Sequence, residues 1–184
     1  MATRGRWPVQ PERVIRGRRV EDDVWLVVGL PPHEDLTVAL PAGPVLVPLA
    51  LWQQRRDELA HRRDALGIWL KPDDDPAAIA TDLDRFSVVA VHFPKFTDGR
   101  GYSTAALLRT RYGYRGELRA FGDVGRDQLF YLARSGFDAF KLAPHRDPDA
   151  ALASFTDFSV RYQGSVDDPV PLFRKRAVSG AIPR

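Results

Sequence analysis

The sequence contains no cysteine, and this absence removes several kinds of chemistry at once. Without a thiol, the chain forms no disulfide, holds no cysteine-ligated iron–sulfur cluster and has no thiol nucleophile. The residues mark no intrinsic cofactor, so the cofactor is unknown at this stage. If the protein takes part in redox chemistry, its electrons must sit on a bound cofactor or on another protein.

Long apolar runs are missing as well. No window approaches the ~18 uninterrupted apolar residues of a membrane-spanning helix, so we expect no membrane partner. The first residues are basic, but no apolar run follows them that would serve as a signal peptide. We therefore expect a cytoplasmic protein.

The sequence also lacks a strong excess of charge of one sign, because the net charge is only +3. Much of the excess lies in basic residues near the two ends of the chain, namely the arginines within residues 4–19 and Arg174, Lys175 and Arg176. Basic ends can bind nucleic acid, but here no aromatic residues alternate with them and no recognition helix is apparent. Nucleic acid is therefore the least favoured of the possible partners.

The length of 184 residues fits one domain with a proper core. We divide the chain into a basic N-terminal arm with the start of a hairpin (1–21), a single α/β domain (22–165) and a C-terminal tail rich in proline and arginine (166–184).

Short apolar runs alternate with helical patterns along the domain. Residues 13–28 predict a small hairpin with a turn at Arg16 and Gly17. Further strands are predicted at 45–49, 68–70, 87–93, 117–121 and 138–142. Helices are predicted at 51–64, 76–86, 102–112, 126–135 and 147–162.

This alternation predicts an α/β fold of about five parallel β–α units after the hairpin. Two architectures fit: an open doubly wound sheet and a truncated TIM-like barrel. In both, function lies beyond the C-terminal ends of the strands. We expect Lys71, residues 95–103, residues 122–127 and Lys141 to converge there.

The first candidate loop enters the helix predicted at 102–112 with the sequence DGRGYS. Its glycines and the helix N-terminus favour an anion, and the Arg100 guanidinium adds a forked donor. Tyr102 and Ser103 complete this predicted anion-binding segment, and Asp98 is a candidate proton carrier. The alternative is structural: Asp98 caps the helix and the glycines make the turn.

The second candidate loop, GDVGRD at 122–127, repeats the pattern one unit later. Asp123 is a second candidate proton carrier and Arg126 a second anion-binding residue. Their structural alternative is again helix capping, with Arg126 and Asp127 in surface ion pairs. Lys95 and Lys141, at predicted strand ends, are further candidates for binding an anion.

Two other patterns favour a structural role. His92 lies inside an apolar strand, which is typical of a hydrogen-bonded core residue. The acidic run at 73–75 offers carboxylates to a divalent cation, but Asp75 followed by Pro76 is typical of a helix N-cap, so we predict no metal site. The remaining histidines, His33, His61 and His145, are expected to be exposed.

Long blocks of this sequence resemble one bacterial family. The blocks are FPKFTDGRGYS, LLRTRYGYRGEL, GDVGRDQLFYLARSGFDAF, LGIWLKPDDDPAAIATDLDRFSVVAV and FSVRYQG. They resemble a domain-of-unknown-function family whose members are described as oxidoreductases involved in sulfite reduction and are encoded near sulfite reductase. The resemblance covers roughly residues 45–173.

The resemblance implies an accessory or oxidoreductase role in assimilatory sulfite reduction, with the sulfite-reductase haemoprotein or its electron donor as partner. Sulfite is a small oxyanion, which is compatible with the predicted rim of arginine and lysine. The alternative from the residues alone is a stand-alone enzyme that binds a small anion or a phosphorylated substrate at the strand ends.

Overall fold

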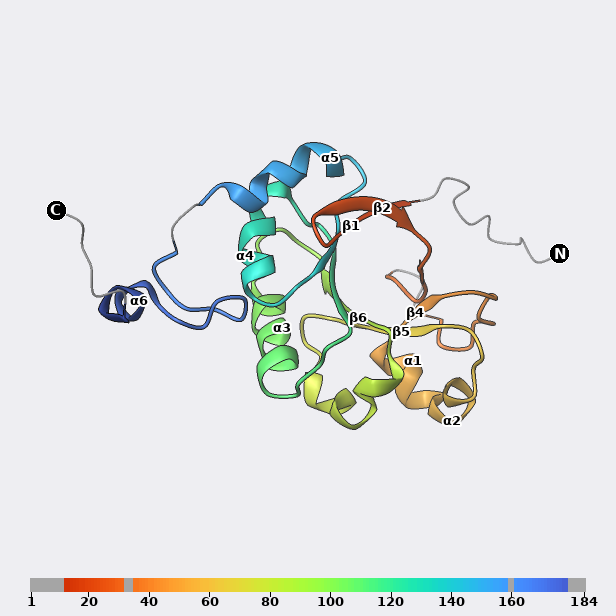
Figure 1. Ribbon diagram of the computed structural model, residues 1–184. Helices are drawn as coiled ribbons and strands as arrows, with labels where there is room; N and C mark the ends of the chain where they lie inside the picture. Colours follow the sequence, from red (N-terminus) through yellow and green to blue (C-terminus); the bar gives the residue numbers. More distant parts are fainter. Residues whose placement is uncertain (1–11, 32–34, 159–160, 179–184) are drawn as a thin grey trace.

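One curled sheet of eight strands organises the molecule (Figure 1). The computed structural model describes residues 12–31, 35–158 and 161–178. The sheet has the order β2-β1-β8-β7-β6-β5-β4-β3. The strands are β1 (Glu12–Arg16), β2 (Arg19–Asp23), β3 (Leu26–Val27), β4 (Val45–Pro48), β5 (Leu66–Leu70), β6 (Val88–Phe93), β7 (Glu117–Gly122) and β8 (Ala139–Lys141).

The strands β3 to β8 are parallel and lie side by side in chain order, whereas β1 is antiparallel to both β8 and β2. Helical segments connect the parallel strands. These segments are α1 (Leu49–Gln54), α2 (Arg56–Ala60), η1 (Pro76–Arg85), α3 (Arg100–Thr110), η2 (Arg126–Gln128) and α4 (Leu129–Arg134). After β8 follow α5 (Pro148–Ala151), η3 (Leu152–Thr156) and α6 (Leu172–Val178).

The helices between the strands cover one face of the sheet only. Trp52 of α1, Ile79 of η1 and Leu108 of α3 are buried against this outer face, together with Ile68 and Val89 of the sheet. The residues of the opposite, concave face form a separate apolar cluster of strand and loop side chains, namely Leu46, Trp69, Val88, Ala90 and Phe121 with Trp25, Val27 and Leu30. A doubly wound sheet would carry helices on both faces. The fold is therefore a curled half-barrel.

The prediction of a mixed, mainly parallel α/β fold with an N-terminal hairpin is confirmed, but a sheet of five units was too small. The error lies in residues 19–28. Gly17 and Arg18 have φ of 54° and 65°, which gives a two-residue hairpin turn of the kind that fits the strand twist. The polar segment β2 is therefore the second hairpin strand, and the apolar stretch after it forms β3, which pairs with β4.

Two predicted helices also differ from the structure. The helix predicted at 51–64 begins at Leu49 and is interrupted at Arg55, which divides it into α1 and α2. The helix predicted to reach residue 162 ends at Thr156, whose hydroxyl donates to the carbonyl of Ala153 in the tight geometry of a 3-10 turn. The predicted N-cap at Asp75 is confirmed, because its side chain accepts from the Ala77 N–H.

The two edge strands of the sheet, β2 and β3, are consecutive in the chain. Only residues 24 and 25 separate them, so the two edges lie within about 10 Å of each other at this link. The indole of Trp25 packs against the concave face beside Gly67. The chain thus draws the edges of the sheet together and leaves an opening at the C-terminal ends of the parallel strands.

Arg109 of α3 joins the two segments that precede β7 and β8, at the N-terminal ends of these strands. Its guanidinium donates to the carbonyls of Gly136, Tyr114 and Gly116 and to the carboxylate of Asp138. Because these acceptors belong to the segments on both sides of β7, one side chain holds the entrances to β7 and β8 together.

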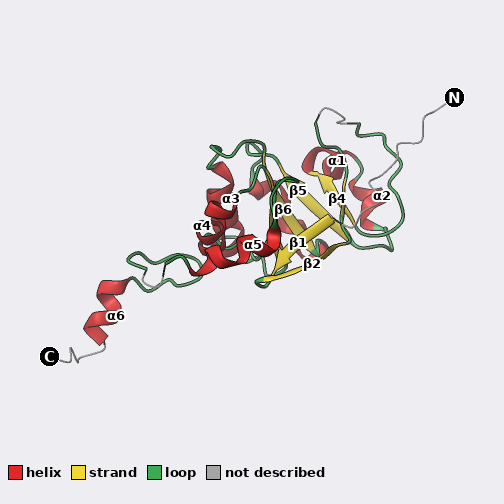
Figure 2. Ribbon diagram, turned by 90° about the horizontal axis from the view of Figure 1, so that it is seen from above, coloured by secondary structure: helices red, strands yellow, loops and turns green. Residues whose placement is uncertain are grey.

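The C-terminal segment leaves the sheet and ends in α6, which lies away from it in both views (Figures 1 and 2). Near its start, the Val166 N–H and the Ser165 hydroxyl donate hydrogen bonds to the carbonyl of Arg134 at the end of α4. Within the described residues, no helix is long and apolar enough to cross a membrane. The predicted basic arm before residue 12, His33 and the last six residues lie outside the described residues.

Candidate functional site

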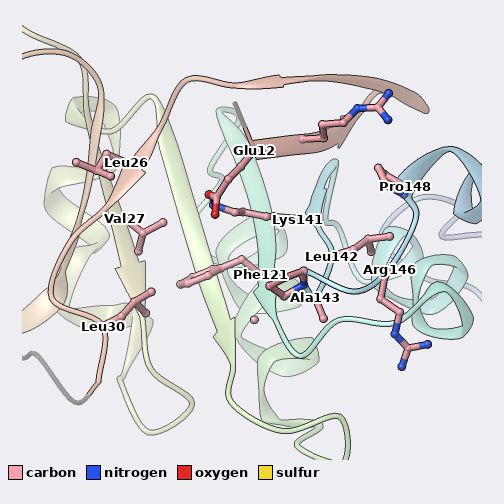
Figure 3. Close-up of a pocket in the computed structure, with 13 residues that line it drawn as sticks. Glu12, Leu26, Val27, Leu30, Phe121, Lys141, Leu142, Ala143, Arg146 and Pro148 are labelled. Atoms are coloured by element: carbon pink, nitrogen blue, oxygen red, sulfur yellow. Dashed lines mark hydrogen bonds and ion pairs between the residues drawn. The ribbon is translucent and has the colours of Figure 1, made fainter. Parts of the chain in front are cut away.

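A pocket of about 590 Å³ opens between β3 on one side and the strands β1, β7 and β8 on the other (Figure 3). We call it the mouth pocket, because it lies at the C-terminal ends of β7 and β8. It is lined by Glu12, Arg13, Leu26, Val27, Leu30, Phe121, Gly122, Lys141, Leu142, Ala143, Pro144, Arg146 and Pro148. This volume is in the range of ~300–1,000 Å³ that is usual for small-molecule sites.

Strand register explains how Phe121 and Lys141 come to share the pocket. They are partners across the parallel pair β7 and β8, so both side chains point to the concave face. Opposite them lie Val27 and Leu30, on the segment that starts with β3 (Figure 3). The pocket therefore joins the N-terminal part of the chain to the last two parallel strands.

Lys141 sits within a cluster of charges. Its ammonium group is paired with Glu12 of β1 and lies 3.4 Å from Oδ2 of Asp23 in β2. The side chains of Lys141 and Glu12 are 17% and 49% exposed, so this pair is open to the mouth pocket. Two carboxylates thus face one ammonium group, so the positive charge of Lys141 is already compensated.

A fully buried ion pair lies next to this cluster. The Arg119 guanidinium donates to Oδ1 of Asp23 at 2.8 Å and lies 2.7 Å from Oε1 of Glu117. Arg119 and Asp23 have no exposed side-chain surface. The sequence analysis missed all three residues. The available signal was an arginine in the middle of the apolar strand β7, because a buried charge requires a partner.

The first candidate loop is internally neutralised. Arg100 donates to both oxygens of Asp98, at 2.9 and 2.6 Å, and is also paired with Asp73. The hydrogen bond from Arg100 lowers the pKa of Asp98 to about 2. Asp98 also accepts from the backbone N–H of Arg100 at 3.2 Å. These contacts leave Asp98 ionised at neutral pH and Arg100 already occupied by carboxylates.

The second candidate loop is tied to the first. Asp123 accepts from the Phe96 N–H at 3.0 Å, and Gln128 donates to the Phe96 carbonyl at 3.1 Å. Gly122, with φ of 107°, brings β7 so close to β6 that a β-carbon there would lie 2.4 Å from the Phe93 carbonyl oxygen. The two loops thus converge as predicted. Asp123, as a hydrogen-bond acceptor, joins the second loop to the first.

The remaining predicted residues differ in their surroundings. Tyr102 is half-buried against the edge of Phe93, and burial raises the pKa of its hydroxyl. Lys95, Ser103 and Arg126 are exposed. None of these residues lines the mouth pocket, where Lys141 is the only member of the predicted anion-binding set.

His92 lies on the concave face beside Phe121, with ring centroids 4.9 Å apart, and beside Trp69. Burial and, to a smaller extent, the charge of Lys71 lower the pKa of its imidazole. His92 is therefore neutral at pH 7. The part of the chain that the structure describes contains no group of three or more acidic, histidine or cysteine residues placed to hold a metal ion.

The fold and the pocket define a class: mixed α/β proteins with a curled, mainly parallel sheet and a ligand-sized pocket at its C-terminal strand ends. Residues 67–173 match the family described as bacterial protein of unknown function (DUF934), and the chain belongs to this family. No curated protein and no solved structure matches the chain. The matched range includes β6 to β8 but not the hairpin and β3, so part of the pocket lies outside it.

Proposed function

We propose that this protein serves assimilatory sulfite reduction, as an accessory protein or oxidoreductase that acts with the sulfite-reductase haemoprotein, and that the mouth pocket is its ligand site. The resemblance of the sequence blocks given above supports the metabolic role. The position of the mouth pocket carries the choice of site, because parallel α/β folds bind ligands at the C-terminal ends of their strands.

The absence of cysteine shapes this proposal. Electrons that pass through the protein must be carried by a group bound to it or must stay on the partner. The mouth pocket is large enough for such a group. The exposed residues Lys95 and Arg126 lie on the two joined loops, outside the lining of the mouth pocket, and provide positive charge for an oxyanion or for an acidic partner.

The metabolic role is tested by deleting the gene in a host that has no second copy. We expect poor growth on sulfite as the sulfur source and normal growth on a reduced source such as cysteine. The wild-type gene should restore growth, whereas Leu30→Trp, which fills the mouth pocket, should not. Unchanged growth of the deletion strain on sulfite would remove sulfite reduction as the function.

The redox role is tested by the absorption spectrum of the tagged protein after gentle isolation from its host. Flavin bands in the isolated chain would make it a redox enzyme. Sirohaem bands from a co-purifying partner would select docking on the haemoprotein. A colourless protein that is isolated alone would count against both.

A stand-alone enzyme for a small anion or a phosphorylated substrate is the second candidate, and the exposed cations of the strand-end loops favour it. Calorimetry with sulfite, sulfate and phosphate tests it. Because Arg100 is occupied by Asp98 and Asp73, Arg126→Ala should weaken anion binding more than Arg100→Ala. Absence of heat with every anion would rule this candidate out.

A further inference from the structure

We propose that the mouth pocket binds a phosphorylated heteroaromatic molecule, with its ring in the apolar middle of the pocket and its phosphate on Arg146. The inference rests on the proposed function only in taking the mouth pocket as the ligand site. Three parts of the pocket carry it: the apolar walls, the ion pair at one end and the arginine at the other.

The middle of the pocket is built for an apolar body. Phe121 lies between Val27 and Leu30 on one side and Leu142 and Ala143 on the other (Figure 3). Apolar and aromatic walls with a few polar groups are typical of small-molecule sites. Aromatic rings pack well in an offset or edge-on arrangement against a phenylalanine. A bare oxyanion would leave these walls without a partner, so the ligand needs an organic ring.

The ion pair of Lys141 and Glu12 gives one end of the pocket a hydrogen-bond donor beside an acceptor. The edge of a heteroaromatic ring offers the complementary acceptor and donor. A phosphate does not fit at this end, because two carboxylates, Glu12 and Asp23, already surround the ammonium group of Lys141. A third negative group would be repelled there.

Arg146 lies at the opposite end of the pocket from Glu12 (Figure 3). The pocket has three cationic side chains, and two are occupied: Lys141 by Glu12, and Arg13 by Asp149 at 2.6 Å. Arg146 has no ion pair within residues 12–31, 35–158 and 161–178 of the structure. A guanidinium matches the geometry of a phosphate with two parallel hydrogen bonds.

The surroundings of Arg146 add to this assignment. One of its terminal nitrogens lies 3.8 Å from the place where a β-carbon on Gly125 would be, and Gly125 directly precedes the exposed Arg126. Arg146, in the loop after β8, thus reaches the loop after β7, where Oδ1 of Asp127 lies 2.6 Å from the same β-carbon position. In complete eight-stranded barrels, the loops after strands 7 and 8 often form the phosphate site.

Calorimetry on the full-length protein tests the proposal with matched ligand pairs: FMN against riboflavin, AMP against adenosine, and inorganic phosphate alone. We expect at least one phosphorylated member to bind about tenfold or more tightly than its parent, as one charged hydrogen-bonded contact would give. Arg146→Ala should remove this advantage and leave the affinity for the unphosphorylated parent unchanged. Arg115→Ala, an exposed arginine in the loop before β7, is the matched control and should change nothing.

Leu30→Trp should weaken both members of the pair that binds, because it fills the space for the ring. Its circular dichroism and melting temperature should match the wild type, and Val27→Phe serves as a second filling variant. No binding by any ligand, equal affinity of phosphorylated and parent molecules, or an unchanged advantage in Arg146→Ala would each overturn the proposal. Phosphate-dependent binding together with normal growth of the deletion strain would keep this inference and remove the sulfite role.

Discussion

Replacement of Asp23 by asparagine should destabilise the protein strongly, because it removes one of the negative charges that compensate a buried guanidinium. Asp23 and Arg119 are both fully buried and lie 2.8 Å apart. Removal of one partner from a buried ion pair costs roughly 3–5 kcal/mol. Glu117 still holds the Arg119 side chain at 2.7 Å. We therefore expect the lower end, about 3 kcal/mol, which corresponds to a decrease of roughly 6–12 °C in Tm for a chain of this size.

Urea unfolding followed by tryptophan fluorescence measures this loss, since Trp25 and Trp69 lie in the same concave layer. The control is Asp149→Ala, which breaks an ion pair whose side chains are 47% and 57% exposed and should cost less than about 1 kcal/mol.

A double-mutant cycle with Arg119→Met completes the experiment. If the two residues act as a pair, the double variant should be more stable than the sum of the single losses predicts, by up to about 3 kcal/mol. Strict additivity, or an Asp23→Asn variant as stable as the control, would refute the claim that this buried ion pair stabilises the fold.

Three further predictions concern single residues. Burial lowers the pKa of His92 below its ordinary value of 6.5, so protonation favours the unfolded chain. The free energy of unfolding should be full above pH 6.5 and should decrease as pH falls below 6.5, by at most about 1.4 kcal/mol per pH unit. Urea titrations of His92→Gln should no longer show this slope. Gly122→Ala should cost more than about 1 kcal/mol, because φ is 107° and the new methyl group would meet the Phe93 carbonyl; Gly99→Ala, with φ of −86° and open space around it, should cost less in the same thermal melts. Arg109→Lys should lower the free energy of unfolding by about 2–3 kcal/mol, because lysine cannot replace the four contacts of the guanidinium. Surface substitutions usually change it by less than ~0.5 kcal/mol, so a change of that size would contradict the role of Arg109.

The parallel strands could be predicted from the sequence because each is a short apolar run between polar helical segments. All five strands predicted between residues 45 and 142 are present, with ends that differ by a few residues. The hairpin partner was assigned wrongly, because the polar strand β2 carries no apolar signal. Its residues are stabilised by long-range ion pairs, such as Asp23 with Arg119, which a local pattern does not reveal.

The candidate site was predicted in part. The strand-end rule brought together the two loops and placed Lys141 at the same end of the sheet. The sequence did not show that Arg100 would form ion pairs with Asp98 and Asp73, nor that Arg146 would line a pocket. Both outcomes depend on side chains from different strand–helix units, and their relative positions follow only from the curl of the sheet.

The order of the strands also sets the order in which the chain can be assembled. Among the described strands, β1 is the first in the chain and pairs with the last, β8. The bonds that Arg119 donates to Asp23 and Lys141 donates to Glu12 join residues 96 and 129 positions apart. During synthesis the hairpin must therefore wait, without its partner strand, until nearly the whole domain has been translated. Closure of such long loops is entropically costly, so the mouth pocket should be the last part of the protein to form.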